Sequence, residues 1–357
     1  MNKSLRIIII ALILICGIAF LVVPLLRQPE PVESPKTKDA STFVSNTNLS
    51  ALHGEEVSLE LALASGFSKI DLFLEDSLLN SWQGTTGKVN WPLDTKKMPL
   101  GFRTLSLVSY DASGNELIET RILRILSDIE PKHQTASVKQ AYLHNPTSFT
   151  QGLEFHGGKL YESTGQNGKS FIAEVESQTG VIRRKVNLDR QYFGEGITIL
   201  NGEIFQLTWQ QGACFVYDLE AFEIKKQFSY TGEGWGICND GKQLIMSNGS
   251  DQIQFRDPGN FSVTKTITVC DRLGTKTKLN ELEYIQGMIY ANVWMSDFIL
   301  VIDPTNGKVQ AEIDCSEIAR AGRDQGEVLN GIAYDQSSGK IYLTGKNWSK
   351  LLEVEIN

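Results

Sequence analysis

The sequence has 357 residues, of which 41% are hydrophobic and 21% charged, an ordinary globular composition that leaves room for one large domain or two. Its formal net charge is −8, and no block rich in Lys and Arg follows the first few residues, so a nucleic-acid-binding surface is not expected. The five cysteines form no C-x-x-C motif and the four histidines stand singly, so the sequence carries no zinc-binding signature.

The chain begins with the features of a membrane anchor. Lys3 and Arg6 precede an unbroken apolar run over residues 7–26, which as a helix would span about 30 Å and cross a bilayer. By the positive-inside rule, the basic residues before this run place the rest of the chain outside the cytoplasm. Residues 1–27 are therefore predicted to be a signal-anchor in the membrane of a cell envelope, facing the periplasm or the exterior. A cleaved signal, or a lipoprotein signal ending at Cys16, is the alternative.

Two segments of different composition follow the predicted anchor. Residues 28–48 are rich in Pro, Ser, Thr, Lys and Glu, which predicts a disordered linker. Residues 49–128 contain about six short stretches in which apolar and polar residues alternate, with turn residues between them. This pattern predicts a small immunoglobulin-like β-sandwich domain. It carries no recognisable chemistry, so its expected role is that of a spacer or docking module.

Residues 137–357 consist of repeated units. Each unit has a first strand, a turn, a second strand and a third strand, and the first four units continue into a fourth strand. The last unit stops at Asn357, and residues 138–144 can supply its missing strand, which would close the ring and remove an exposed sheet edge. Four short antiparallel strands in each repeat of about 40–50 residues predict an all-β fold with a five-bladed β-propeller. We expect a monomer, because a closed propeller leaves no long edge strand for pairing.

The residues that open the repeats indicate a shared pocket, because the innermost strand of each propeller blade lines the central channel. These positions hold Gln151, Glu195, Trp235, Asn280 and Asn330. Fourteen residues later, at the end of each second strand, stand Gly165, Trp209, Gly249 and Trp294, and the last unit places Lys346 at the matching point. A partly desolvated carboxylate among indoles has a raised pKa suited to proton transfer, and indole faces hold cationic amines. The sequence thus predicts a small-molecule pocket with aromatic walls.

Each of these residues also has a purely structural interpretation. Glu195 could bond backbone N–H groups of the channel, and the Trp209 and Trp294 indoles could be packing wedges between blades. Lys346 could extend its ammonium group to solvent, and the two asparagines could cap turns. The sequence pattern alone leaves both interpretations open.

Nine segments of the repeat region, in order along the chain, resemble the plant and bacterial type of glutaminyl cyclase. They are SFTQGL (148–153), LYESTG (160–165), FGEGIT (193–198), QLTW (206–209), GEGWG (232–236), LNELEY (279–284), YANVW (290–294), LNGIA (329–333) and TGKNW (344–348). The resemblance covers about residues 140–357 and none of the N-terminal segments. It implies a five-bladed propeller that converts the N-terminal glutamine of a peptide or protein to pyroglutamate and releases ammonia.

The resemblance also implies roles for individual residues. The glutamate of the F-G-E-G motif, here Glu195, is the general acid/base. The expected substrate-binding residues are Phe149, Gln151, Phe193, Trp209, Trp235, Asn280, Trp294, Asn330 and Lys346. Of these, Gln151, Asn280 and Lys346 are the candidates for stabilising the oxyanion, with Lys350 lying close in sequence to Lys346.

No cofactor and no catalytic metal are implied, because the zinc-dependent animal enzyme has a different fold; a structural cation in the channel is left open. The fold leaves two other functions as alternatives. A non-catalytic propeller that binds or scaffolds at the cell envelope would be expected to lose the carboxylate at 195 or the indoles. A hydrolase with a channel metal would need a ring of His, Asp and Glu residues, which the repeat positions do not supply.

Overall fold

The structure, a computed structural model, describes residues 40–45 and 48–357. Among these residues no helix combines the length and the apolar character needed to cross a bilayer. The predicted anchor, residues 1–27, lies outside the described residues.

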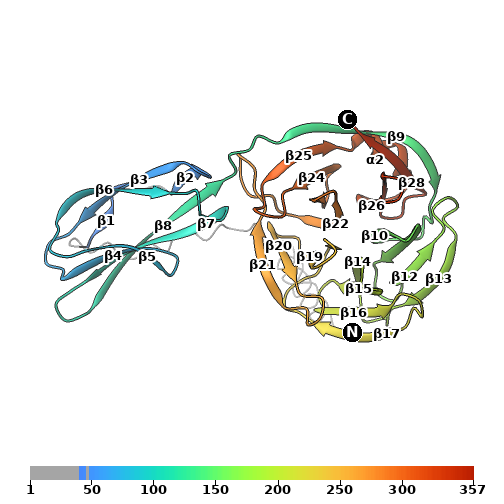
Figure 1. The fold of residues 1–357 in the computed structure, drawn as a ribbon, viewed down its shortest axis with the longest axis horizontal. Coiled ribbons are helices and arrows are strands. Elements are labelled where there is room, and N and C mark those ends of the chain that lie inside the picture. The colour runs from blue at the N-terminus through green and yellow to red at the C-terminus, as the bar shows by residue number, and fades with distance from the viewer. Residues whose placement is uncertain (1–39, 46–47) are drawn as a thin grey trace, which may run out of the picture. The chain divides into compact units, whose positions relative to one another are not determined.

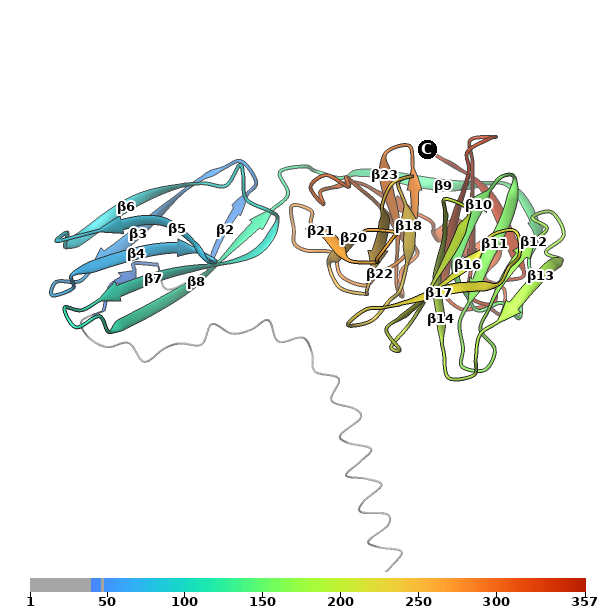
Figure 2. The same ribbon diagram turned by 60° about the horizontal axis from the view of Figure 1, so that its bottom comes forward.

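The N-terminal part of the described chain is built from two β-sheets, whose strands are visible in Figure 2. One sheet has the order β1-β3-β6 and the other the order β2-β8-β7-β4-β5. The strands are β1 (Thr42–Phe43), β2 (Leu49–Leu52), β3 (Glu56–Leu63), β4 (Lys69–Leu74), β5 (Ser77–Trp82), β6 (Gly87–Asp94), β7 (Gly101–Tyr110) and β8 (Glu116–Leu126). Strand β1 lies inside the stretch for which we predict a disordered linker, and its backbone pairs with β3.

Strand β3 shows why these residues form a sheet with one buried face. Leu59, Leu61 and Leu63 are buried, whereas Ser58 before them and Glu60 between the first two are exposed. Successive side chains of a strand point to opposite faces, so this alternation places three leucines on one side. The alternating pattern in the sequence is thereby confirmed for this strand.

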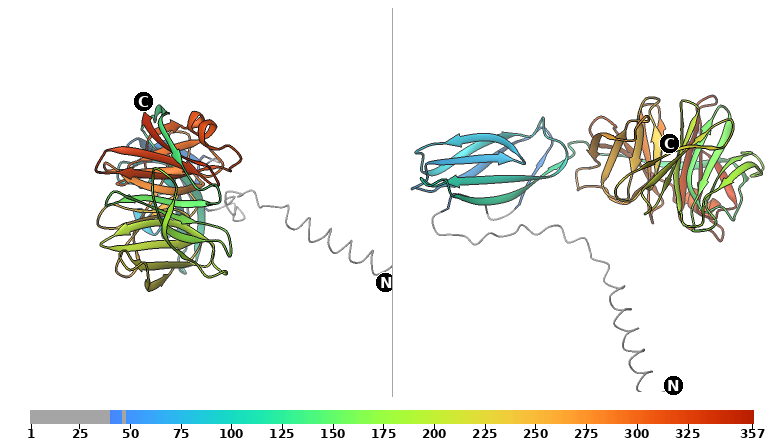
Figure 3. Two further views of the ribbon diagram at one scale, coloured as in Figure 1. Left: turned by 90° about the vertical axis from the view of Figure 1, so that its right-hand side faces the viewer. Right: turned by 90° about the horizontal axis from the view of Figure 1, so that it is seen from below.

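The rest of the chain forms a β-propeller, seen as a ring of sheets in Figure 1 and from other sides in Figure 3. Three blades are separate four-stranded sheets, of consecutive strands β10–β13, β14–β17 and β18–β21. Their strands are β10 (Thr150–His156), β11 (Lys159–Thr164), β12 (Phe171–Val175), β13 (Ile182–Asn187), β14 (Gly194–Leu200), β15 (Glu203–Thr208), β16 (Ala213–Asp218), β17 (Ile224–Ser229), β18 (Ile237–Asn239), β19 (Leu244–Ser247), β20 (Gln252–Arg256) and β21 (Val263–Thr268).

The last two blades are joined into one eight-stranded sheet by β9 (Lys132–Leu143). The fourth blade comprises β22 (Leu279–Ile285), β23 (Met288–Val293), β24 (Phe298–Ile302) and β25 (Val309–Asp314). The fifth comprises β26 (Leu329–Asp335), β27 (Lys340–Gly345) and β28 (Lys350–Ile356), and the helix α2 (Ser316–Gly322) precedes it.

Strand β9 closes the ring. Its residues 136–143 pair antiparallel with β28 and supply the outer strand of the fifth blade, as the sequence predicts. Its first residues, Lys132 to Thr135, pair parallel with β25 of the fourth blade. The strand therefore begins at Lys132, before residue 137, where the sequence predicts the start of the propeller. One strand thus ties together the two blades between which the ring would otherwise open.

The cores of the propeller lie between neighbouring blades. Each of five buried clusters draws its side chains from two adjacent blades; one, for example, packs Ile245 and Ile253 of the third blade against Leu282 and Leu300 of the fourth. The four cysteines of this region are buried and free. Of these, Cys214, Cys238 and Cys315 belong to the clusters, where they act as small apolar residues.

Glycines near the channel let the inner strands approach closely. A Cβ atom on Gly152 would lie 2.4 Å from the backbone nitrogen of Ile197, and one on Gly196 would lie 2.6 Å from that of Ile237. These distances leave no room for a side chain. The glycine after the first residue of these repeats is therefore explained by packing of one inner strand against the next.

Candidate functional site

The residues that open the repeats share an unusual backbone setting. In four blades the pairing of the first two strands shifts register at this position, so that Gln151, Glu195, Asn280 and Asn330 are left out of the regular ladder. Such β-bulges redirect side chains and are common beside active sites. Trp235 stands two residues before β18 and bonds the backbone of Ser247 in the neighbouring strand. The five positions therefore lie at the same end of the inner strands.

Glu195 lies at the centre of a buried polar group. Gln151 Nε2 donates a hydrogen bond of 2.9 Å to Glu195 Oε1. Asn330 Nδ2 in turn donates to Gln151 Oε1 at 3.2 Å and to the carbonyl of Thr150 at 3.0 Å. Among the described residues no backbone N–H group bonds the Glu195 carboxylate, so the structural interpretation for this residue is wrong. Asn330 acts through Gln151, whose amide it orients toward Glu195.

A second chain of hydrogen bonds holds the backbone of Glu195. Ser163 donates to the Glu195 carbonyl, and Gln206 Nε2 donates to Ser163 Oγ at 2.8 Å. The hydroxyl of Tyr217 donates to Gln206 Oε1, also at 2.8 Å. All these groups are buried, so each bond is shielded from competing water. The bulge that presents the Glu195 carboxylate is thus rigidly supported by the second strands of two blades.

The electrostatics of Glu195 make its carboxyl hold a proton more readily than an exposed glutamate does. Burial raises the pKa of this carboxyl well above its usual range, Lys346 lowers it and Glu233 raises it further. Burial lowers the pKa of Lys346, which Glu195 and Glu327 partly restore. Lys346 is only 6% exposed, so the interpretation that it extends to solvent is wrong. Its neighbour Lys350 instead bonds the Ala321 carbonyl, which leaves Lys346 as the lysine of the site.

Aromatic rings from successive blades form an arc beside this polar group. The Lys346 ammonium lies 4.9 Å from the centre of the Phe149 ring, and Phe149 packs edge-on against Phe193 at 6.1 Å. Phe193 contacts Trp209 at 5.6 Å. Edge-to-face geometry is favourable for aromatic pairs at these separations. The predicted residues Phe149, Phe193, Trp209 and Lys346 are therefore brought together.

The arc continues through two further indoles. Trp235 and Trp294 lie 5.7 Å apart with their planes at 87°. Trp294 is 40% exposed, so this end of the arc faces solvent. The Lys278 ammonium lies 5.7 Å from the centre of the Trp294 ring. An aromatic wall that is open on one side can admit the first residue of a peptide while the rest of the peptide stays in water.

The glycines at the ends of two second strands make room for these rings. A Cβ atom on Gly165 would lie 2.4 Å from Phe193 Cε1, and one on Gly249 would lie 2.7 Å from the Trp235 ring. In blades with glycine at this position, the free space is filled by an aromatic ring that stands just before an inner strand. In the other blades the residue at this position is itself a Trp or a Lys, which supplies the ring or the ammonium group. This explains the mixture of Gly, Trp and Lys at one repeat position.

Replacing Gly165 by Ala is expected to push Phe193 and Gln151 out of place, because the added carbon would also lie 3.0 Å from Gln151 Cγ. Overpacking of this kind costs about 1–3 kcal/mol. We expect KM to rise clearly, because the displaced side chains belong to the pocket, and the melting temperature to fall only modestly. Steady-state kinetics and thermal unfolding would measure both. Gly274→Ala is the matched control, since nothing lies within 4 Å of its Cβ position; a wild-type KM in Gly165→Ala would contradict the packing argument.

Asn280 has a distinct place in the site. Its side-chain oxygen is buried without a hydrogen-bond partner among the described residues, as is that of Asn330. Unsatisfied buried acceptors are rare and call for an explanation. A donor group of a bound molecule would satisfy the Asn280 oxygen, and the substrate-binding role of Asn280 stays a prediction.

Glu233 is a member of the site that the sequence reasoning did not single out. It lies in the quoted GEGWG segment, two residues before Trp235, and its carboxylate accepts hydrogen bonds from both Trp209 and Trp235. The signal that could have found it is an acid flanked by glycines just before a pocket indole. Neither its partner blade nor its contacts can be read from spacing.

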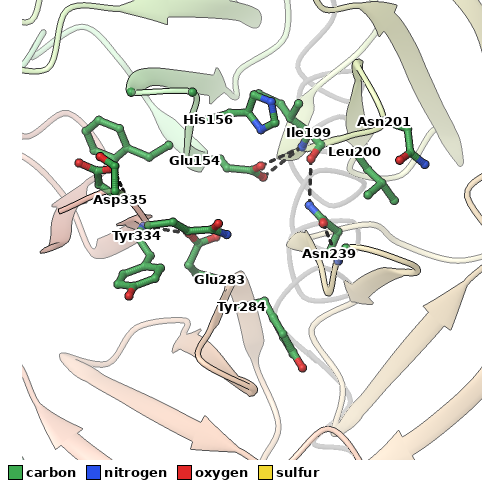
Figure 4. A pocket seen from close by; sticks show the side chains of 16 residues that line it. Glu154, His156, Ile199, Leu200, Asn201, Asn239, Glu283, Tyr284, Tyr334 and Asp335 are labelled. Atoms are coloured by element: carbon green, nitrogen blue, oxygen red, sulfur yellow. Dashed lines mark hydrogen bonds between the residues drawn. The ribbon is translucent and has the colours of Figure 1, made fainter. Parts of the chain in front are cut away.

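A cavity of about 580 Å³ lies at the opposite ends of the inner strands (Figure 4). Its walls include Glu154 and Glu283, whose carboxylates accept hydrogen bonds from the backbone N–H groups of Ile199 and Tyr334. None of the predicted site residues lines it. The two acids are occupied in joining blades, so we place the chemistry at the Glu195 end. Within the described chain no group of three or more His, Cys, Asp or Glu side chains is arranged to hold a metal ion.

Comparison with known proteins identifies the family of this chain. A glutaminyl-peptide cyclotransferase of Arabidopsis thaliana is 37% identical over 235 residues, which are 64% of this chain and 73% of that protein. The crystal structure of Myxococcus xanthus glutaminyl cyclase matches with a TM-score of 0.61 and 34% identity, over 64% of this chain and 99% of that one. The family model for glutamine cyclotransferase matches residues 115–356. Because this match covers well over half of the sequence and the site lies within it, the chain belongs to the glutamine cyclotransferase family.

Proposed function

We propose that this protein is a glutaminyl-peptide cyclotransferase, which converts the N-terminal glutamine of a peptide or protein to pyroglutamate and releases ammonia. The observation that carries the proposal is the buried Glu195 carboxylate, bonded by Gln151 beside an arc of aromatic rings in a chain of this family. The named activity of its Arabidopsis and Myxococcus relatives supports the same reaction.

The reaction needs a proton to move but no oxidant and no second substrate. The α-amine nitrogen attacks the γ-carbonyl carbon of the same residue, and the bond from this carbon to the side-chain nitrogen breaks. Glu195 takes the proton that the amine loses and delivers one to the leaving nitrogen, which departs as ammonia. A carboxyl whose pKa is raised by burial holds a proton more readily than an exposed one, which suits a group that must both accept and deliver a proton.

The other site residues orient the glutaminyl chain and bind the developing charge. The Phe149, Phe193 and Trp209 rings provide apolar walls that favour the folded chain over its many extended forms. The Lys346 ammonium and the Gln151 amide are the donors suited to the oxyanion of the tetrahedral intermediate. The acceptor oxygen of Asn280 is instead suited to an N–H group of the substrate.

The test is ammonia release from a Gln-initiated dipeptide amide by the full-length chain in detergent, with and without a chelator. We expect turnover that survives chelation, and none with the matching Asn-initiated or N-acetylated peptides. Loss of turnover on chelation would contradict metal-independent chemistry while leaving the activity in place. If the folded protein converts no Gln-initiated peptide, the proposed function is wrong.

We further propose that the N-terminal segment anchors the enzyme in a membrane, with the propeller outside the cytoplasm. Support comes from the basic residues and the long apolar run at the start of the sequence. The two-sheet unit before the propeller would then serve as an immunoglobulin-like spacer or docking module. A membrane fraction that retains the protein after alkaline carbonate washing, with the propeller accessible to added protease in intact spheroplasts, is the expected result. Release by the wash, or protection from protease, would contradict it.

A further inference from the structure

Glu233 connects two blades through one carboxylate. Its Oε2 atom accepts hydrogen bonds from Trp209 Nε1 and Trp235 Nε1, both at 2.9 Å. Its Oε1 atom accepts from Gln210 Nε2 at 3.1 Å. Trp209 follows the second strand of the second blade, and Trp235 precedes the first strand of the third. A single oxygen therefore fixes the edges of two indoles that come from different sheets.

These bonds determine how the two rings are oriented. An indole has one polar atom, so bonding Nε1 at a fixed point limits rotation of the ring about its side-chain bonds. The other edges are held by aromatic contacts, of Trp209 with Phe193 and of Trp235 with Trp294. Both indoles are partly exposed, and without Glu233 their N–H groups would turn to water. The aromatic arc is continuous only because the carboxylate bridges Trp209 and Trp235.

Glu233 also brings a negative charge to the pocket. Burial tends to raise the pKa of this carboxyl, but the three donors outweigh burial and hold the pKa below its ordinary value. The side chain is therefore ionised at neutral pH. Its negative charge raises the pKa of Glu195, whereas the positive charge of Lys346 lowers it. Tyr230 is the remaining titratable group that interacts with Glu195. The hydroxyl of Tyr230 is committed to the Thr208 backbone, and burial raises its pKa, so it stays neutral.

We propose that Glu233 is a positioning residue that joins the Trp209 and Trp235 indoles into one wall of the substrate pocket and sets a fixed negative charge within electrostatic reach of Glu195. This inference rests on the proposed cyclotransferase function. Glu233 touches no reacting atom in this scheme. It acts by holding the two rings in place, and by a negative charge that counteracts the effect of Lys346 on the pKa of Glu195.

Two substitutions separate the two effects. In Glu233→Gln the side-chain oxygen can still accept both indole bonds, because both go to a single oxygen, and the Gln210 amide can turn to face the new amide. This change removes the charge and keeps the wall. Glu233→Ala removes both the charge and the wall. Glu223→Gln, at an exposed position on the same blade as Trp209, is the matched control.

For Glu233→Ala we expect KM to rise about tenfold or more, the change expected from the loss of two hydrogen bonds that shape the pocket. The tryptophan emission should shift to longer wavelength as the freed indoles meet water. For Glu233→Gln we expect KM and emission close to wild type. The limb of the kcat/KM profile that belongs to Glu195 should move to lower pH, because the nearby negative charge that raises the pKa of Glu195 is gone.

The outcomes distinguish this proposal from the proposed function. If the wild-type protein has no cyclase activity, the proposed function is wrong. The tryptophan emission of Glu233→Ala would still test whether Glu233 holds the indoles. If the wild type is active but Glu233→Ala leaves KM and the tryptophan emission unchanged, Glu233 does not hold the two indoles in the pocket wall. An unmoved pH limb in Glu233→Gln would overturn the electrostatic role.

Discussion

Replacing Glu195 by Gln is expected to lower kcat by about 10² to 10⁴, the usual contribution of a general acid/base. The amide that replaces the carboxylate can still accept the hydrogen bond from Gln151 Nε2, so the pocket keeps its shape. It can neither take the proton of the attacking amine nor deliver one to the leaving nitrogen. KM should therefore change little, and the loss should fall on kcat. Ammonia release under saturating substrate measures it.

The pH dependence gives this prediction a second measurement. Burial holds the pKa of Glu195 well above that of an exposed glutamate, so one limb of the wild-type kcat/KM profile should lie above the ordinary carboxyl range. That limb should be absent from the residual activity of Glu195→Gln. Thermal unfolding serves as the control, because removal of a buried charge should leave the fold intact. An unchanged kcat would keep the activity and remove Glu195 from its role.

Replacing Glu162 by Ala is expected to destabilise the propeller by about 3 kcal/mol or more, as expected when one partner of a buried pair is removed. Glu162 and His144 are 3.1 Å apart, and both side chains are 1% exposed. Ser148 and Thr150 also donate to the Glu162 carboxylate, at 3.1 and 2.7 Å. All three groups would be left buried without this acceptor. Urea denaturation, followed by the emission of the propeller tryptophans, measures the loss.

This pair lies where the ring closes. His144 follows β9, and its other ring nitrogen is 2.8 Å from the carbonyl of Trp348, two residues after Lys346. The substitution should therefore loosen the segment that presents Lys346, and activity should fall before the protein unfolds. Glu176→Ala is the control, since Glu176 pairs with Arg183 at the surface and should contribute far less. Equal effects of the two substitutions would contradict a special role for the buried pair.

The same pair predicts a pH dependence of stability. Burial lowers the pKa of His144, but Glu162 and the carbonyl of Trp348 together raise it by more, and the net shift is upward. A histidine with a raised folded-state pKa contributes its full stabilisation below its unfolded pKa of about 6.5. The contribution declines as the pH rises through the folded-state value. Urea midpoints measured from pH 5 to pH 9 should therefore fall more steeply for the wild type than for Glu162→Ala.

Much of the architecture could be predicted from sequence because it depends on short-range periodicity. The alternation that buries Leu59, Leu61 and Leu63 follows from the two-residue repeat of a strand. The propeller follows from the repeat itself, and the fifth unit's missing strand pointed to the residues that became β9. The start of that strand at Lys132 did not follow, because its parallel pairing with β25 joins residues about 180 positions apart, and no local pattern encodes such a contact.

What the sequence by itself determined about this protein is its family, its propeller and the residue types that gather at one end of the inner strands. Only the tertiary structure decided how those residues act. It showed that Asn330 orients Gln151, that Lys346 rather than Lys350 is buried in the site, and that Glu233 joins two indoles. Each of these depends on β-bulges and contacts between blades. A repeat fixes which residues are equivalent, whereas the pKa and the orientation of a side chain depend on neighbours from other blades, which only the closed ring brings together.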